Sequence, residues 1–528
     1  MSKELIRQAM RKFGFGSEKY IVSSLILGFI LILGLVLRFY DLGSESFWLD
    51  EVATTIEAQQ SIPELLTIGR LDQPPAYYLP IHFWIQVFGV SEVSLRSFSA
   101  LAGMGSIILI YLIGRPLFGN EVGLLGAFFM AVSEFQIGIS QEARNYSLFE
   151  FAILLSFFFF VQFVRSRKMI HLILYGISSA FMVNSNAYGV FILVGQNLFF
   201  VLQVLTSKRS IVSWIVCQAC VMLAVIPYLA PLLFGGQGVE GAINLNVTGV
   251  APPLFSDIFR TMYRFMLPPR RYFGMDMIWS ESLIAIYAMA AALLVVGILI
   301  TIIRQGKSNW ISAVREALGS FLQAPDMKSK LLLVGCWLLC PLLLPFIISQ
   351  ITSPIYSHKY VIGAASALYL LLALGLFWIR KIVPLAVSLS VFMVLAIPGL
   401  TYYYVSDTKE QWRDAAAFVE GNSIGSEVII FAPNDNIGIQ QEAFDYYYQG
   451  SLPGCSIGPD ELSDKQVSEI LKQCISGYER FWVVMRNAIP DTGRYRSFFL
   501  NPDQSSMHLI KEQGFIQITV YLFELKQR

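Results

Sequence analysis

The sequence predicts an α-helical polytopic membrane protein with about 11 to 13 transmembrane helices and a small extracytoplasmic α/β domain at its C-terminal end. Composition is the first observation, because 55% of the 528 residues are hydrophobic and only 14% are charged. The mean hydropathy of +0.58 is far above that of a water-soluble chain of this length. The second observation is a series of long apolar runs, and the third is the change to a polar composition after Ser406.

The apolar runs give the positions of the expected helices, because a helix needs about 20 mostly apolar residues to cross the bilayer. The candidate segments are 21–37, 97–113, 122–132, 147–164, 169–183, 189–205, 211–229, 282–303, 331–349, 361–378 and 382–401. Segment 77–89 is shorter and of mixed polarity, so we expect a re-entrant or interfacial helix there.

Basic residues indicate the orientation, because cytoplasmic loops are enriched in Lys and Arg. They concentrate in the N-terminal tail, predicted to be residues 1–20, and in alternate connections such as 304–330. This places the transmembrane domain at 21–402 and puts the loop 39–96 and the C-terminal domain, 403–528, on the extracytoplasmic side. We therefore expect a multi-pass protein of the cell (cytoplasmic) membrane, surrounded by membrane lipids.

Charge and motifs also bear on possible ligands. The 38 Lys and Arg balance 37 Asp and Glu, so bulk charge gives no argument for nucleic acid as a partner. We find no internal repeat, no phosphate-binding or dinucleotide-binding glycine motif and no Cys/His cluster spaced for zinc.

The C-terminal domain shows the alternation of strand-like and helix-like segments that is typical of a small α/β fold. A helix is expected at 411–420, and strands are expected at 427–433, 480–486 and 515–525.

The six cysteines are too few for a disulfide scaffold. Those that lie in apolar runs are interpreted as packing residues: Cys217, Cys220, Cys336 and Cys340. Cys455 and Cys474 fall in the domain placed outside, where a disulfide between them and two free thiols are both open.

The first outer loop contains two adjacent carboxylates, Asp50 and Glu51, directly after the residues FWL. They are typical of a solvated loop or of the first turn of an interfacial helix, where carboxylates suit the positive end of the helix dipole. They also suit general-base chemistry, because deprotonating a hydroxyl requires a positioned carboxylate or imidazole and the chain has only four His. On that hypothesis Asp50 is the base and Glu51 supports or orients it.

Cations in the outer segments are the second group of candidates. Arg144 is costly near lipid unless it is paired or binds an anion, so a structural ion pair with Glu142 or Asp50 and a phosphate clamp are both open. Lys359 sits where the inside-positive bias disfavours it, and lipid headgroups and a substrate phosphate are both candidate ligands. The remaining candidates for binding a donor sugar or phosphate are Arg70, Gln73, Tyr77, Tyr146, His358, Tyr360, Arg270 and Arg271.

Six segments taken together form a specific combination: FWLDE, DQPPAYYLPIHFWIQVFGVSEVSLRSFSAL, LIGRPLFGNEVGLLGA, ISQEARNYSL, YSHKYVIGAASALYL and KEQWRDAAAFVE. In this order, from Arg38 to about Glu420, they resemble family 39 of the GT-C glycosyltransferases. That family includes protein O-mannosyltransferases and lipid A aminoarabinose transferases.

The resemblance implies a GT-C fold, a polyprenyl-phosphate-linked sugar as donor, the first-loop aspartate as base, and inverting transfer on the extracytoplasmic face. A polyprenyl phosphate is a good leaving group, so such a site needs one base and several cations rather than the two carboxylates of a glycosidase. The chain has Gln73 where the family often has His or Lys, and Lys359 where it often has Arg. Lysine supplies charge without the bidentate fork of arginine, so part of the clamp is expected from Arg70 or the Arg270 region.

The sequence therefore predicts a mannosyltransferase-like membrane glycosyltransferase of the cell envelope, specific for a hexose or a pentose. The acceptor, whether lipid, glycan or protein, is open. A transporter or flippase of lipid-linked saccharides is the alternative, but it should show two related halves with interrupted helices. A noncatalytic relative is a further alternative, against which the intact acidic pair argues. No cofactor or metal site is expected, although a divalent cation on the two carboxylates is left open.

Overall fold

The computed structural model describes residues 18–66, 74–207, 211–234, 252–266, 327–351, 354–379, 385–433, 438–458, 462–487, 492–500 and 507–525. These residues form two compact units. The helical unit comprises the described residues within Met1–Tyr40, Ser61–Phe83 and Arg96–Tyr402. The sheet unit comprises those within Asp41–Gln60, Trp84–Leu95 and Tyr403–Arg528, so it contains most of the first predicted outer loop as well as the C-terminal segment.

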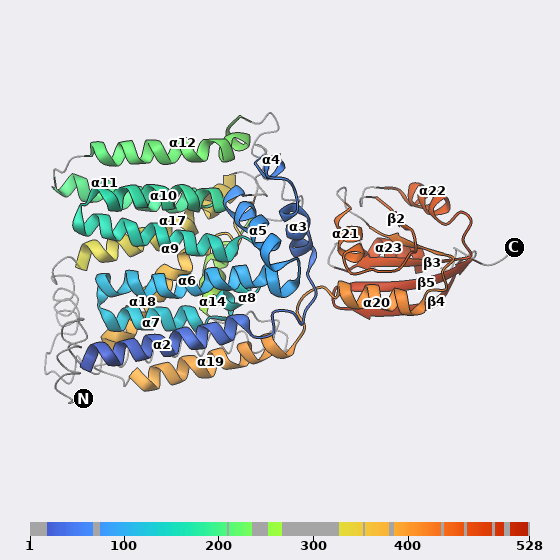
Figure 1. The fold of residues 1–528 in the computed structure, drawn as a ribbon, viewed down its shortest axis with the longest axis horizontal. Helices are drawn as coiled ribbons and strands as arrows, with labels where there is room; N and C mark the ends of the chain where they lie inside the picture. The colour runs from blue at the N-terminus through green and yellow to red at the C-terminus, as the bar shows by residue number, and fades with distance from the viewer. Residues whose placement is uncertain are drawn as a thin grey trace. The chain divides into compact units, whose positions relative to one another are not determined.

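The helical unit is a bundle whose long helices run roughly along one direction (Figure 1). The helices that lie wholly or mostly in this unit are α2 (Glu18–Phe39), α4 (Ile62–Leu65), α5 (Pro75–Phe88), α6 (Glu92–Phe118), α7 (Asn120–Val132), α8 (Glu134–Ser140), α9 (Tyr146–Ser166), α10 (Met169–Ser185), α11 (Gly189–Ser207), α12 (Val212–Phe234), α14 (Phe255–Met266), α17 (Met327–Ile351), α18 (Gly363–Ile379) and α19 (Leu385–Val405). Helix α10 packs against α9 and α12, α17 against α11 and α18, and α7 against α2 and α18.

Several of these helices suit a bilayer. Within the described ranges, four are long and apolar enough to cross it: Ile21–Phe39, Glu92–Phe118, Tyr146–Ser166 and Met327–Ile351. Helices α7 and α8 together pass the same test as one span bent by 62°. Shorter apolar helices are α10, α11, α12, α18 and α19. The predicted helical membrane fold is therefore confirmed, whereas the predicted span 282–303 lies outside the described residues.

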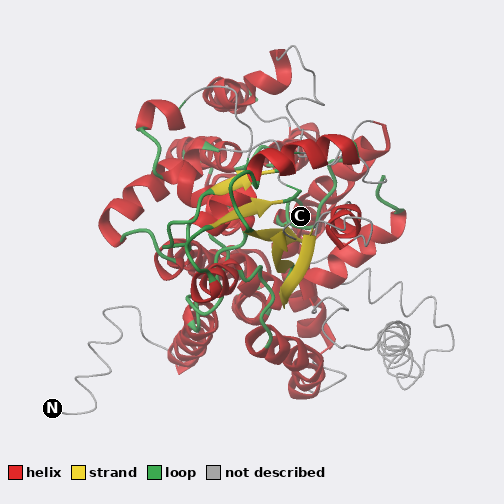
Figure 2. Cartoon of the chain, turned by 90° about the vertical axis from the view of Figure 1, so that its right-hand side faces the viewer, coloured by secondary structure: helices red, strands yellow, loops and turns green. Residues whose placement is uncertain are grey.

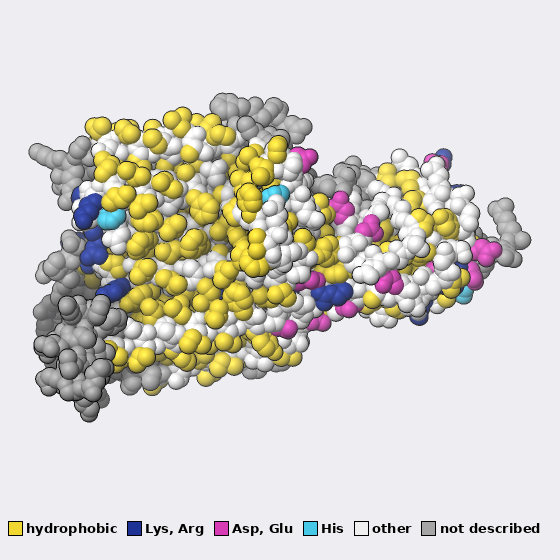
Figure 3. Space-filling model, viewed as in Figure 1, with side chains coloured by type: hydrophobic (Ala, Val, Ile, Leu, Met, Phe, Trp, Pro, Cys, Tyr) yellow, Lys and Arg dark blue, Asp and Glu magenta, His cyan; other side chains and the backbone are white. Residues whose placement is uncertain are grey.

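The surface of the helical unit has the polarity expected of a protein in lipid. Figure 3 shows an almost continuous apolar surface along the bundle, with Lys and Arg gathered near one end of the helices. On α2, Leu25, Phe29 and Ile32 are 69%, 64% and 64% exposed. Such an apolar face is stable in contact with acyl chains and unfavourable in water.

Buried polar groups at the helix ends are satisfied by side chains of neighbouring helices. Arg38, near the end of α2, donates to the carbonyl oxygens of Met130 and Ala131 at 2.8 and 3.0 Å, where α7 ends and the chain bends. Gln141 in turn donates to the carbonyl oxygens of Arg38 and Tyr40 at 3.2 and 2.9 Å. Carbonyls at helix ends lack intrahelical partners, so these bonds hold α2 and α7 at fixed positions.

The sheet unit contains a five-stranded mixed sheet in the order β2-β1-β3-β5-β4 (Figure 2). The strands are β1 (Glu427–Phe431), β2 (Gly454–Ser456), β3 (Arg480–Arg486), β4 (Met507–Phe515) and β5 (Ile518–Leu525). Strand β1 is parallel to β2 and β3, and β5 is antiparallel to β3 and β4. The helices of this unit are α3 (Leu49–Ala58), α20 (Trp412–Asn422), α21 (Ile439–Asp445), α22 (Asp464–Cys474) and α23 (Thr492–Leu500).

The core of this domain follows the sequence pattern. Strands β1 and β3 are buried along most of their length, as expected for central strands, and both were predicted. Cys455 of β2 and Cys474 at the end of α22 form a disulfide, which decides a pairing that the sequence left open. Strand β4 was not predicted, because it is a largely exposed edge strand with a polar sequence.

Helices α6 and α7 approach closely at Gly123, where an added Cβ atom would lie 2.9 Å from the backbone nitrogen of Arg115 and 3.0 Å from the carbonyl oxygen of Tyr111. Backbone atoms cannot move away cheaply, so we expect Gly123→Ala to destabilise the protein by about 1–3 kcal/mol. The measurement is the apparent melting temperature in detergent. Gly28→Ala on α2 is the control, because an added Cβ atom there has no neighbour within 4 Å. An equal melting temperature for the two variants would contradict this account of the α6–α7 contact.

Candidate functional site

Helix α3 carries the two carboxylates of the first predicted outer loop. Trp48 precedes it in an extended conformation and donates its backbone N–H to Glu51 Oε2 at 3.3 Å. The Glu51 side chain therefore folds back onto the helix start, as in a capping box. Asp50 and Glu51 both lie in the first turn, with Glu51 fully buried and Asp50 half-buried. The adjacent pair is thus split into one carboxylate built into the helix start and one at a more accessible position.

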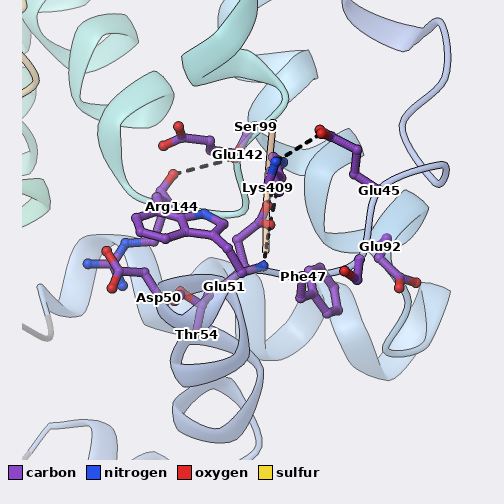
Figure 4. Close-up of polar contacts among 12 residues, drawn as sticks. Glu45, Phe47, Asp50, Glu51, Thr54, Glu92, Ser99, Glu142, Arg144 and Lys409 are labelled. Atoms are coloured by element: carbon purple, nitrogen blue, oxygen red, sulfur yellow. Dashed lines mark hydrogen bonds and ion pairs between the residues drawn. The ribbon is translucent and has the colours of Figure 1, made fainter. Parts of the chain in front are cut away.

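Glu51 is paired with a cation of the C-terminal segment. Lys409 Nζ lies 3.4 Å from each carboxylate oxygen of Glu51, and the two side chains are 12% and 0% exposed. Figure 4 shows the contacts of Lys409 with Glu51 and Glu45. Glu45 accepts hydrogen bonds from the backbone N–H of Thr408 and, at 3.0 Å, from that of Lys409. A buried carboxylate requires such a partner, so Glu51 is held in place by the segment that begins the C-terminal domain.

Glu410 connects α3 to the sheet. It is 1% exposed, and its Oε2 atom accepts the backbone N–H of Leu49 at 3.0 Å and the indole N–H of Trp412 at 2.7 Å. Its Oε1 atom accepts from Arg486 Nε at 2.6 Å, at the end of β3. Its carbonyl oxygen accepts from Ser46 Oγ at 2.5 Å. Sequence reasoning did not select Lys409 or Glu410 as site residues, although the adjacent charged pair two residues before a tryptophan in KEQW was a usable signal.

Tyr447 holds the loop before α3 through the backbone of Phe47. Tyr447 accepts the backbone N–H of Phe47 at 2.6 Å and donates its hydroxyl to Glu92 Oε1 at 2.7 Å. Burial, together with the nearby Glu92 carboxylate, raises the pKa of Tyr447 well above its usual range, so the hydroxyl stays protonated and remains a donor. Arg413 forms an ion pair with Glu92 and donates to the carbonyl oxygen of Ser44 at 3.0 Å.

In the helical unit the structure brings four predicted site residues together. Lys359 Nζ is 3.0 Å from both carboxylate oxygens of Glu142, and their side chains are 27% and 17% exposed. The same ammonium group lies 5.3 Å from the centre of the Tyr146 ring. The rings of Tyr146 and Tyr360 are 5.9 Å apart, and Tyr360 stacks on Tyr188 at 4.8 Å. This cluster combines a half-exposed cation with aromatic faces, the groups that bind a phosphate and a sugar ring.

His358 belongs to a neighbouring cavity of about 260 Å³. The cavity is lined by Pro253, Asp257, Arg260, Thr261, Arg264, Pro354, Tyr356, Ser357 and His358. Arg264 Nη1 lies 3.0 Å from His358 Nδ1, and Arg260 is paired with Asp257 at 2.7 Å. Burial, and then the adjacent cations Arg264 and Lys359, lower the pKa of His358 to about 3. The imidazole is therefore neutral and accepts a hydrogen bond from the guanidinium.

The other predicted residues are placed as follows. Arg144 lies in the turn before α9, where its N–H donates to the carbonyl oxygen of Glu142 at 2.8 Å and its own carbonyl oxygen accepts from Ser99 at 3.4 Å (Figure 4). Glu142, which with Asp50 was considered as an ion-pair partner of Arg144, is bound to Lys359. Tyr77 is 1% exposed, with its ring 5.2 and 6.1 Å from those of Tyr78 and Phe98.

Four predicted site residues, Arg70, Gln73, Arg270 and Arg271, lie outside the described residues. In the parts of the chain that the structure describes, no group of three or more His, Cys, Asp and Glu side chains is placed to hold a metal ion.

Comparison with solved structures identifies the fold. The fold resembles ArnT from Cupriavidus metallidurans, solved bound to undecaprenyl phosphate, with a TM-score of 0.58 and 11% identity over 96% of this chain and 98% of that one. It also resembles the Archaeoglobus fulgidus oligosaccharyltransferase tethered to an acceptor peptide, with a TM-score of 0.51 and 13% identity over 92% and 71% of the two chains. At these identities the likeness establishes the fold, and the chain has the GT-C fold.

A family model matches part of the chain. Residues 72–233 match the dolichyl-phosphate-mannose-protein mannosyltransferase family, so the predicted resemblance is confirmed. An uncharacterised protein of Aquifex aeolicus is 28% identical over 34% of this chain and 38% of its own length. YkcB of Bacillus subtilis, provisionally named a mannosyltransferase, is 28% identical over 31% of this chain and 23% of its own. The chain thus spans well under half the length of these two relatives.

The environment of His358 makes a pH-dependent contribution to stability. Its folded-state pKa of about 3 lies below the value of about 6.5 in an unfolded chain, so the unfolded state binds the extra proton between these values. The contribution is complete above about pH 6.5 and is lost as the pH falls toward 3. We expect the melting temperature to fall less between about pH 7 and pH 4.5 in His358→Asn than in the unmodified protein.

The measurement is the apparent melting temperature in detergent across that range. His508→Asn, which changes an exposed histidine of β4, is the control. The same acid-induced loss in the His358 variant and in the unmodified protein would show that His358 makes no such contribution.

Proposed function

We propose that this chain transfers one sugar from a polyprenyl-phosphate-linked donor to an acceptor hydroxyl or amine on the extracytoplasmic face of the cell membrane. The single observation that carries this proposal is the match of residues 72–233 to the dolichyl-phosphate-mannose-protein mannosyltransferase family in a chain with the GT-C fold. The structural relative bound to undecaprenyl phosphate and the one tethered to an acceptor peptide support a lipid-linked donor and a separate acceptor.

Asp50 is the proposed general base. As the acceptor oxygen or nitrogen forms a bond to the anomeric carbon, its proton passes to the Asp50 carboxylate. The bond between the anomeric carbon and the phosphate oxygen breaks, and the polyprenyl phosphate leaves with the electron pair. Attack opposite to the leaving group inverts the anomeric configuration. The position of Asp50 supports this role, because it is half-buried on a rigid first turn whose other carboxylate, Glu51, is occupied by Lys409.

Lys359 and Arg144 are the proposed ligands of the leaving phosphate. Lys359 is bound to Glu142 at 3.0 Å, so a phosphate that binds this ammonium group competes with the carboxylate or joins it. The aromatic faces of Tyr146 and Tyr360 beside Lys359 suit a sugar ring or the first isoprene groups. The expectation that no cofactor is needed, with a divalent cation left open, stays a prediction.

The test is transfer from a panel of radiolabelled polyprenyl-phosphate sugars by the purified chain in proteoliposomes. We expect one donor to be consumed and Asp50→Asn to lower transfer by at least about a hundredfold, because the amide cannot accept the proton. Asp41→Asn is the matched control, since Asp41 is exposed and adopts a positive φ of 62° that asparagine tolerates. It should retain full transfer.

Two results would contradict the proposal. Full activity of Asp50→Asn would remove Asp50 as the base. If the unmodified chain transfers and hydrolyses no donor but moves a lipid-linked saccharide between leaflets, the chain is a transporter.

A further inference from the structure

The segment Thr408–Arg413, which leads into α20, lies against the loop that begins α3 in the sheet unit. Its contacts are close and polar, and the groups that make them are mostly buried. Lys409 binds Glu51, Glu410 accepts the backbone N–H of Leu49, and Arg413 donates to the carbonyl oxygen of Ser44. Helix α21 packs on α3, and the rings of Phe47 and Tyr446 are 5.5 Å apart. Helix α3 is therefore anchored in the C-terminal domain and belongs to its compact unit.

Among these contacts, Glu410 acts on the helix start itself. The first N–H groups of a helix have no intrahelical acceptors, and an anion near them is stabilised by the helix dipole. The Glu410 carboxylate meets both conditions at Leu49, and it is held in turn by Arg486 and Trp412. Arg486, at the end of β3, and the indole ring of Trp412 hold this buried carboxylate in one position. The carboxylate in turn holds the start of α3 through the Leu49 N–H.

Asp50 directly follows Leu49, so its Cα and Cβ atoms move with the backbone that Glu410 holds. Displacement of a general base by about 1 Å can reduce a rate by about a hundredfold. We propose that Glu410 is a positioning residue that sets the place of the Asp50 carboxylate, with Lys409 assisting through Glu51. This inference rests on the proposed role of Asp50 as base, and it makes the C-terminal domain a required part of the catalytic machinery.

The sheet unit contains a matched control for Glu410. Glu427 is also a fully buried glutamate, lies 3.1 Å from Arg480 Nε and accepts the indole N–H of Trp482 at 2.8 Å. Its side-chain partners are thus of the same types as Arg486 and Trp412, and it also accepts the backbone N–H of Ile424 at 3.3 Å, so these bonds lie within β3 and the turn before β1. Loss of charge at Glu427 should therefore disturb the domain without releasing the helix start.

The experiment compares Glu410→Gln with Glu427→Gln in the full chain, reading melting temperature, kcat and donor KM, and amide hydrogen exchange of Leu49–Val52. Both variants should melt at lower temperature, since each leaves an arginine without its carboxylate. Only Glu410→Gln should speed exchange at Leu49–Val52, by at least about tenfold, and lower kcat by at least about tenfold with donor KM within about twofold. Lys409→Met should give a smaller change of the same kind, and it serves if Glu410→Gln fails to fold.

Two outcomes would overturn the inference. Unchanged exchange at Leu49–Val52 in Glu410→Gln would show that the carboxylate does not fix the helix start. Equal losses of kcat in the Glu410 and Glu427 variants would show that Glu410 only stabilises the domain. If the unmodified chain transfers no sugar, the proposed function fails, while the exchange comparison still decides whether Glu410 fixes α3.

Discussion

The Glu410 carboxylate joins the first turn of α3 to Arg486 and Trp412, and the position of the proposed base depends on that junction. It accepts one N–H from the helix start and two from the sheet domain, all within 3.0 Å. Buried carboxylates are stable only when their charge and lone pairs are satisfied, so the contact has few alternative geometries. The pair of Glu51 with Lys409 adds a second constraint on the same turn. Together they present Asp50 on a fixed backbone, as its proposed role as a general base requires.

Three cations of the segments predicted to lie outside are held by side-chain partners. Lys359 is bound to Glu142, Arg260 to Asp257, and Arg264 contacts the neutral ring of His358. Such pairing lowers the cost of placing charge near lipid, and it leaves the cations able to exchange one anion for another. A phosphate group whose lipid tail lies in the bilayer would meet cations that are already in place. Its affinity would depend on how much more strongly these cations bind a phosphate than their present carboxylate partners.

Much of the architecture could be predicted from local sequence. Apolar runs and the periodicity of strands reflect whether each side chain faces lipid, the protein interior or water, and this can be read without knowing distant contacts. Ten of the expected spans have helices in the described residues, and β1, β3 and α20 lie where the pattern placed them. Strand β4 was missed because an edge strand buries too little to leave an apolar pattern.

The candidate site was predictable only in part. Asp50, Lys359 and Glu142 stood out by charge near the membrane boundary, but the partners of Lys359 and Glu51 depend on contacts between segments far apart in the chain. Glu410 was missed for the same reason.

The stereochemistry of transfer distinguishes direct displacement assisted by Asp50 from a reaction through a covalent intermediate. The purified chain would be given a polyprenyl-phosphate sugar of known anomeric configuration, and the configuration of the product would be determined by NMR. Direct displacement assisted by Asp50 predicts inversion of the anomeric centre, with product formation lost in Asp50→Asn. Retention of configuration would indicate a covalent intermediate and would contradict direct attack assisted by a single base.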